Sequence, residues 1–141
     1  MKILIAVDGS IYTQKALDYV AANRSMFADG HQLVLVNVCP GIPGYVAGRV
    51  RKEVIQDYYA EESAKIIEPV KALLIERGLT DYTIDLRHGR IAEEILSSAK
   101  EHDAGLIVMG THGHGVIGRA LMGSVASKVI AEGGIAVLLV K

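Results

Sequence analysis

The chain has 141 residues and a formal net charge of −1, so it lacks the excess of positive charge that nucleic-acid binding normally requires. Its residues are 50% hydrophobic and 22% charged, as in ordinary α/β proteins, and no apolar run approaches the roughly 20 residues that span a membrane. The single cysteine, Cys39, has no internal disulfide partner and indicates a reducing compartment. We therefore expect residues 1–141 to form one cytoplasmic domain, with no nucleic-acid or membrane partner.

Strand and helix patterns alternate from the N-terminus onward. The apolar run Lys2–Val7 predicts a buried strand, and Ser10 is placed to cap a helix that continues to about Phe27. The next run, Leu33–Val38, is continuous rather than alternating, which is typical of a strand covered on both faces. Pro40–Gly44 then predicts a loop.

The middle of the chain predicts a long helix, an edge strand and a shorter helix. Helical spacing extends from about Arg49 to Arg77, and we expect Pro69 to kink or divide this helix. Tyr82–Leu86 alternates between apolar and polar residues and predicts a half-exposed strand near a sheet edge. Apolar residues recur at helical spacing again from Ile91 to Ala99.

The C-terminal part adds two strands around one more helix. Gly105–Met109 and Ile135–Val140 predict the strands, and Val125–Ile130 predicts the helix between them. Strands that alternate with helices of this length pair in parallel through right-handed crossovers. We expect an α/β fold: a single open, doubly wound, five-stranded parallel sheet in the order 3-2-1-4-5, with helices on both faces.

A glycine-rich segment joins the fourth strand to the last helix. Glycines before a helix start let the backbone approach an anion, and the free N–H groups and the positive helix end bind phosphate. Ligands of such sheets bind beyond the carboxyl ends of the strands, where the strand order reverses. We therefore expect three loops to form one site: Asp8–Ser10, Cys39–Gly44 and Gly110–Ser124.

The glycine spacing carries a family resemblance. Four residues fit the pattern G-x2-G-x9-G-[S/T] without a gap: Gly110, Gly113, Gly123 and Ser124. Together with the opening segment Ile3–Ser10, this pattern resembles the ATP-binding branch of the universal stress protein family, whose fold is adenine nucleotide alpha hydrolase-like. The resemblance covers nearly the whole chain and is weakest from about Pro40 to Lys65. Alanine stands at Ala6 and Ala136, where the family usually has proline.

The resemblance implies a binding site for ATP, with Mg²⁺ or Mn²⁺ bound through the phosphates. It places Ala6, Val7 and Asp8 on the adenosine side. It gives Val38 backbone hydrogen bonds to adenine, and sets Met109 and Gly110 near base and ribose. The phosphates are assigned to Gly113, Gly123, Ser124 and Val125. The chemistry agrees, because a carboxylate at a strand end can accept ribose hydroxyls and a serine hydroxyl at a helix start can donate to phosphate or ligate Mg²⁺.

Other patterns in the chain have weaker interpretations. Gly113–Gly118 spells the dinucleotide fingerprint G-x-G-x-x-G, but it follows the fourth strand rather than the first. No P-loop sequence occurs. His112 and His114 make a weak metal site, because no cysteine or carboxylate stands near them in the sequence. We expect Cys39 to be a buried or half-buried spectator thiol, and the remaining histidines to face solvent: His31, His88 and His102.

Three functions remain open from the sequence. The first is an ATP-binding stress-response protein, a nucleotide-dependent homodimeric switch with at most slow hydrolysis or autophosphorylation, read by an unidentified regulatory partner. The resemblance and the apolar edge strand Ile135–Val140 both indicate that this strand forms the dimer. The second is a nucleotidyl- or phosphoryl-transfer enzyme, with its additional substrate pocket in Gly41–Tyr59. The third is an interaction module that has lost nucleotide binding.

Overall fold

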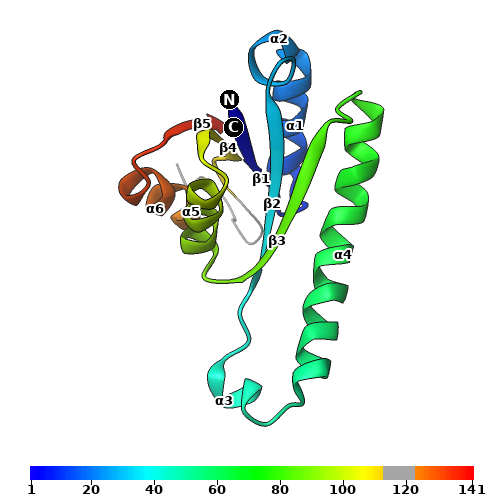
Figure 1. The fold of residues 1–141 in the computed structure, drawn as a ribbon, viewed down its shortest axis with the longest axis vertical. Coiled ribbons are helices and arrows are strands. Elements are labelled where there is room, and N and C mark those ends of the chain that lie inside the picture. Colours follow the sequence, from blue (N-terminus) through cyan, green and yellow to red (C-terminus); the bar gives the residue numbers. More distant parts are fainter. Residues whose placement is uncertain (113–122) are drawn as a thin grey trace.

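The protein is described from a computed structural model, which covers residues 1–112 and 123–141. It forms a five-stranded sheet in the order β3-β2-β1-β4-β5, and every neighbouring pair of strands is parallel (Figure 1). The expected fold class and strand order are therefore confirmed. The strands are β1 Lys2–Ala6, β2 Gln32–Pro40, β3 Tyr82–Gly89, β4 Ala104–Gly110 and β5 Ala136–Val140. The helices are α1 Ile11–Ala22, α2 Arg24–Phe27, α3 Gly44–Ala47, α4 Lys52–Glu76, α5 Ile91–Glu101 and α6 Ser124–Glu132.

Helices cover both faces of this sheet because successive strand side chains point to opposite sides. On one face, Ile5 of β1 shares a core with Leu17 of α1 and Leu74 of α4. On the other face, Leu4 shares a second core with Val129 of α6. All five side chains are fully buried. Each contributes about 1.5–3 kcal/mol relative to an exposed position, so the continuous apolar runs of the sequence supply two cores from one central strand.

The sequence predicted that Pro69 kinks or divides the long helix, and the division is wrong, because α4 continues through Pro69 as a single element of 25 residues. Proline removes a hydrogen bond to the carbonyl four residues earlier, which belongs to Lys65. Both Pro69 and Lys65 are exposed, so water can pair with that carbonyl. The neighbouring Val70 and Leu74 are buried in the core, and their burial offsets the lost bond.

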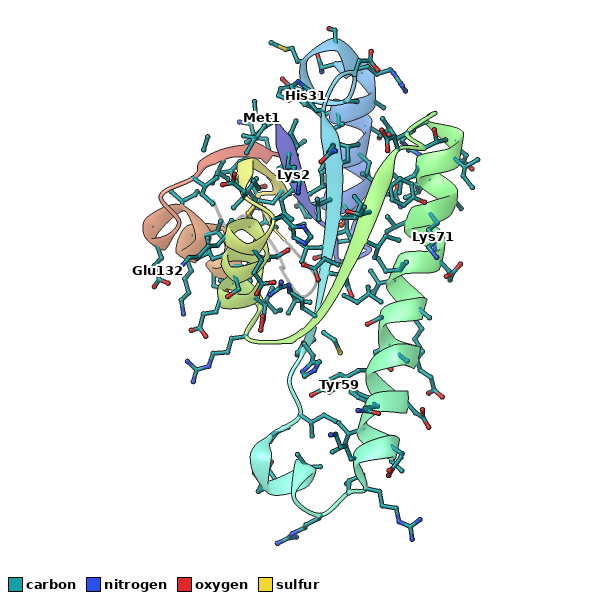
Figure 2. All side chains as sticks on the ribbon, viewed as in Figure 1. Met1, Lys2, His31, Tyr59, Lys71 and Glu132 are labelled. Atoms are coloured by element: carbon teal, nitrogen blue, oxygen red, sulfur yellow. The ribbon has the colours of Figure 1, made fainter. Side chains whose placement is uncertain are left out.

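The N-terminal part of α4 and the short helix α3 project beyond the carboxyl ends of the strands (Figure 1). The helix begins at Lys52, and the two arginines before it, Arg49 and Arg51, are exposed to solvent. Tyr59 ties this projection to the rest of the protein. Its side chain points from α4 toward the segment that leaves β2 (Figure 2). Its ring stacks on His88 at the end of β3, with ring centroids 4.1 Å apart, and its hydroxyl accepts a hydrogen bond from the Ile42 N–H at 2.9 Å.

The two edge strands behave as their sequences indicate. β3 is half-exposed along its length, and β5 directs Val137 and Leu139 to one core and Leu138 and Val140 to the other. None of the helices in the described part of the chain is long and apolar enough to cross a membrane.

Candidate functional site

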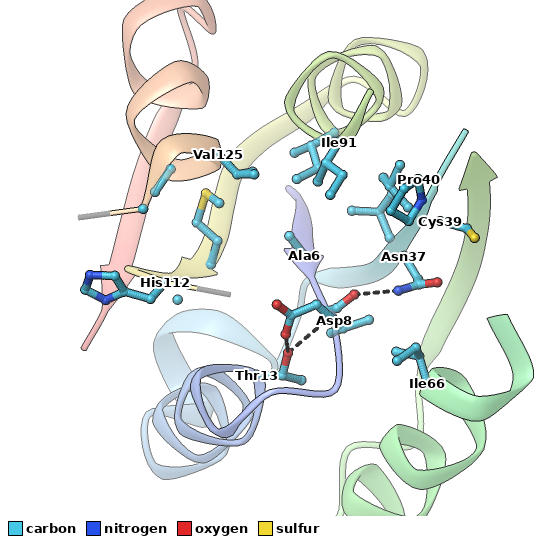
Figure 3. A pocket seen from close by; sticks show the side chains of 18 of the residues that line it. Ala6, Asp8, Thr13, Asn37, Cys39, Pro40, Ile66, Ile91, His112 and Val125 are labelled. Carbon is cyan, nitrogen blue, oxygen red and sulfur yellow. Dashed lines mark hydrogen bonds between the residues drawn. The ribbon is translucent and has the colours of Figure 1, made fainter. Parts of the chain in front are cut away.

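A cavity of about 320 Å³ lies at the carboxyl ends of β1, β2 and β4 (Figure 3). β1 stands between β2 and β4, and the chain leaves β1 on one face of the sheet and β4 on the other, so this is the point where the strand order reverses. The volume is within the range of small-molecule sites. Described residues from each of the three loops that the sequence assigned to one site line this cavity, among them Asp8, Cys39 and Gly123.

The cavity gathers all the predicted site residues that the structure describes. They are Ala6, Val7, Asp8, Val38, Met109, Gly110, Gly123, Ser124 and Val125. Gly113, the remaining predicted residue, lies outside the described residues, as does His114. The cavity has further walls that the sequence did not indicate, from α1, α4 and α5, because residues far apart in the chain meet only in the folded protein.

The β2 side of the cavity is mainly apolar. Val38 and Pro40 line it from the strand, Ile66 from α4, and Ile91 and Ile95 from α5 (Figure 3). Aliphatic side chains on three elements form a wall suited to a flat, largely apolar group, which buries its faces without losing hydrogen bonds.

Asp8 stands in the middle of the cavity, just beyond the end of β1. Its Oδ1 accepts a hydrogen bond from the Ser10 N–H at 2.9 Å and another from the Thr13 hydroxyl at 2.8 Å. Its own N–H donates to the Thr13 hydroxyl oxygen at 2.9 Å. Ser10 caps α1 as predicted, with its Oγ 3.4 Å from the Thr13 nitrogen. Asp8 therefore links the end of the strand to the first turn of the helix and also lines the cavity.

Asn37 is a buried polar side chain that the sequence interpretation missed. It is 4% exposed, and its Nδ2 donates to the Val7 carbonyl at 2.8 Å. The Val7 N–H donates to the Val36 carbonyl at 2.9 Å, so β2 holds both sides of this residue. The only available signal was one amide within the apolar run Leu33–Val38, because a buried polar group needs a partner.

The two glycines that the structure describes in the phosphate segment, Gly110 and Gly123, differ in how much space they leave for a side chain. Neither Gly110 nor Gly123 has a positive φ. A Cβ at Gly110 would lie 2.4 Å from the Cβ of Tyr12, so β4 approaches α1 only with glycine there. The Gly123 N–H donates to the Thr111 carbonyl at 2.7 Å, and a Cβ would lie 3.2 Å from that oxygen. Gly110 is therefore required by the packing of β4 against α1 whether or not an anion is bound, whereas a side chain at Gly123 meets only a tight contact.

The start of α6 faces the cavity. Its N-cap is Gly123, so Ser124 is the first helical residue, and its side chain is exposed. The first N–H groups of a helix have no partner within the helix, and the positive end of the helix dipole lies there. With Val125 beside it on the cavity wall, this end offers donors to an anion.

The cysteine and histidine side chains have local partners. Cys39 lines the cavity and is 7% exposed, and burial raises the pKa of its thiol, which makes it a poor nucleophile. Of the histidines expected to face solvent, His88 is exposed as predicted, although its ring stacks on Tyr59. His31 and His102 are half-buried, and the Nε2 of His102 lies 3.1 Å from Asp85 Oδ2. The prediction is therefore wrong for His102, whose side chain turns toward the carboxylate of β3.

No group of three histidine, cysteine or acidic residues that could hold a metal ion occurs within residues 1–112 and 123–141. His112, at the mouth of the cavity, has its Nδ1 3.0 Å from the Thr111 hydroxyl oxygen and its ring 5.2 Å from that of Tyr12. The partners of this imidazole thus include a hydroxyl and an aromatic ring.

Curated relatives match the chain from end to end. A universal stress protein of Thermus aquaticus, named for the QAH/OAS sulfhydrylase 3′ region, is 34% identical over 139 residues, which cover 99% of this chain and 97% of the relative. The universal stress protein YxiE of Bacillus subtilis is 33% identical over 151 residues, which cover 99% and 98%.

Solved structures share the fold. The hypothetical protein MJ0577 is 28% identical with a TM-score of 0.80, and the match covers 99% of this chain and 94% of that one. The universal stress protein of Archaeoglobus fulgidus in complex with dAMP is 24% identical with a TM-score of 0.70, covering 100% and 98%. Two more proteins with this fold were solved with cAMP or AMP bound. The model of the universal stress protein family matches residues 1–141, and the chain belongs to that family.

Proposed function

We propose that the protein binds an adenine nucleotide in this cavity, as ATP with Mg²⁺ or Mn²⁺ bound through the phosphates. The observation that carries the proposal is the order of the cavity walls across the sheet. The apolar wall comes from β2, the Asp8 carboxylate from β1, and the helix start from the loop after β4. A nucleotide has the same order: a flat base, a sugar with hydroxyls, and phosphates.

The backbone of β2 supports an adenine at the apolar wall. The Val36 carbonyl accepts a hydrogen bond from Val7, so it points toward β1. Residues two apart in a strand direct their backbone groups to the same side, so the N–H and C=O of Val38 also point that way. β1 ends at Ala6, before it reaches Val38, and Val38 lines the cavity. A donor and an acceptor on one edge match the Watson–Crick edge of adenine.

The phosphates are proposed to lie at Gly123, Ser124 and Val125, near the positive end of α6. Related proteins with the same fold hold dAMP, cAMP and AMP, which supports an adenine nucleotide as the ligand class. Asp8 brings a negative charge into the same cavity, and a divalent cation carried by the phosphates offsets the repulsion between them. Among the residues that the structure describes, the geometry assigns none a catalytic role, and we propose that any ATP hydrolysis is slow.

The protein is proposed to act as a cytoplasmic homodimer whose nucleotide state is read by a regulatory partner. β5 lies at the edge of the sheet and holds Val137, Leu138 and Leu139 half-buried. Antiparallel pairing of β5 with a second copy covers these side chains and satisfies the edge backbone.

The test is to identify the bound nucleotide and then to measure its affinity. Mass spectrometry of protein purified without added nucleotide is expected to find an adenine nucleotide. Calorimetry on protein stripped of ligand is expected to show tighter binding of ATP with Mg²⁺ than of NAD. Tighter binding of NAD, or no binding of ATP or AMP, would show that the proposal is wrong.

A further inference from the structure

Thr13 is a buried side chain in the first turn of α1. It is 3% exposed and is one of the residues that line the cavity. A threonine further along a helix commonly bonds a carbonyl of the preceding turn, and a residue in the first turn has no such turn before it. Here the hydroxyl leaves the helix and forms two hydrogen bonds with one residue, Asp8. It donates to Oδ1 at 2.8 Å and accepts from the Asp8 N–H at 2.9 Å (Figure 3).

These bonds belong to a set that holds Asp8 from both sides. On the β2 side, Asn37 holds the carbonyl of Val7, which belongs to the peptide bond between Val7 and Asp8. On the helix side, the Ser10 N–H and the Thr13 hydroxyl both donate to the same carboxylate oxygen. The backbone contact sets where the residue lies. The two contacts to Oδ1 set the side-chain torsions, and so the direction in which the carboxylate faces.

A carboxylate that is oriented before the ligand arrives binds it more tightly, because the entropy of ordering the side chain is lost during folding rather than during binding. The backbone supplies one donor to Oδ1, the Ser10 N–H. The second donor comes from a side chain on α1. Valine has nearly the same shape as threonine but no hydroxyl, so the chain offers a substitution that removes the contact with little change of volume.

We infer that Thr13 is a positioning residue for the sugar of the nucleotide: it holds the Asp8 carboxylate in the orientation that accepts the ribose hydroxyls. The inference rests on the proposed function, because it places the ribose beside Asp8. It concerns one part of the ligand only. Loss of the Thr13 hydroxyl lowers the affinity for nucleotides that carry ribose hydroxyls. The affinity for nucleotides without these hydroxyls stays nearly unchanged.

The experiment compares ATP with 2′,3′-dideoxy-ATP, which lacks both ribose hydroxyls, by calorimetry on ligand-free protein with Mg²⁺. The wild-type protein is expected to bind ATP more tightly than the dideoxy compound. Thr13→Val is expected to lower the affinity for ATP by about tenfold, which corresponds to the loss of one hydrogen bond to a charged group. It is expected to lower the affinity for the dideoxy compound by less than about twofold. Thr13→Ser keeps the hydroxyl and is expected to retain the wild-type ratio of the two affinities.

Two controls separate positioning from general damage. Thr83→Val makes the same change at an exposed position of β3 and is expected to alter neither affinity. Circular dichroism and the thermal midpoint report whether each variant is folded. If Thr13→Val does not fold, Thr13→Ala removes the same hydroxyl with a residue that favours helix, and the same ratio is measured.

The possible outcomes separate the positioning role of Thr13 from the proposed binding of an adenine nucleotide. If Thr13→Val or Thr13→Ala leaves the ratio of the affinities for ATP and 2′,3′-dideoxy-ATP unchanged, Thr13 has no positioning role. That result overturns the inference, whether or not both affinities fall. Equal binding of both nucleotides by the wild-type protein overturns it as well, because Asp8 then does not bind the ribose. If the wild-type protein binds neither ATP nor AMP, the proposed function itself is wrong and the inference is lost with it.

Discussion

Gly110 lies directly against Tyr12: a Cβ added to residue 110 would stand 2.4 Å from the Cβ of Tyr12. Tyr12 belongs to the first turn of α1, and Gly110 is the last residue of β4. The glycine thus allows the helix start and the strand end to come together beside Asp8. Its role in packing is independent of any ligand, so part of the glycine pattern serves the fold itself.

The first prediction is that Gly110→Ala destabilises the protein. The added methyl group forces the strand end and the helix apart, and overpacking of this kind costs about 1–3 kcal/mol in the free energy of unfolding. Chemical denaturation measures the loss. Gly44→Ala is the matched control, because a Cβ there meets nothing within 4 Å. Equal stability of Gly110→Ala and the wild type would show that this contact is not a constraint.

The second prediction concerns Gly123. Its φ of −73° suits any residue, so substitution is expected to leave the fold intact, as judged by circular dichroism. A Cβ at this position would lie 3.2 Å from the Thr111 carbonyl, at the start of the helix that is proposed to bind phosphate. Gly123→Val is therefore expected to weaken ATP binding by at least about tenfold, and Gly123→Ala by less. Calorimetry measures both, with Gly44→Val as the control, and normal binding by Gly123→Val would place the phosphates elsewhere.

The third prediction concerns pH and the polar cluster between β3 and α5. Burial on its own raises the pKa of Asp85, but hydrogen bonds from Ser98, Arg87 and His102 outweigh it and hold the pKa below the ordinary value of 3.8. The nearest of these donors is the Ser98 hydroxyl, 2.5 Å from Oδ2. Arg87 also pairs with Glu94 and with Glu101.

A carboxyl group whose pKa is lower in the folded protein than in the unfolded chain stabilises the fold above its unfolded pKa. The contribution of Asp85 is therefore complete above about pH 4 and is lost as the pH falls through the lower folded pKa. Urea denaturation between pH 7 and pH 3 measures it. Asp85→Asn is expected to cost about 1–3 kcal/mol at pH 7 and to flatten the dependence on pH. Curves of the same shape for both proteins would contradict the assignment.

The fourth prediction tests the proposed dimer. The Val140 carbonyl accepts a hydrogen bond from the Thr111 N–H, so residues 136, 138 and 140 direct their backbone groups toward β4. Val137 and Leu139 direct theirs to the outer edge of the sheet. Leu139→Pro removes an outward donor and is expected to give a folded monomer by light scattering. Leu138→Pro is the comparison, because it breaks the pairing with β4 and is expected to lower the thermal midpoint. A wild-type monomer at micromolar concentration would contradict the proposed interface.

The pattern of apolar and polar residues predicted the strands and helices well, because the burial of each strand or helix face determines where apolar residues stand. Leu33–Val38 is apolar because the strand is covered on both faces, and Tyr82–Leu86 alternates because β3 is an edge strand. The predicted division of the long helix at Pro69 did not occur, because the burial of Val70 and Leu74 outweighs the low helix propensity of one proline.

The sequence by itself determined the fold class, the family and the loops that form the site, because strand and helix periods and a spaced glycine motif are properties of neighbouring residues. Only the tertiary structure decided which distant side chains complete the site. Thr13 and Asn37 lie 24 positions apart in the chain and converge on Asp8 and Val7. Hydrogen bonds between separate elements depend on how those elements pack, and that packing leaves no periodic trace in the sequence.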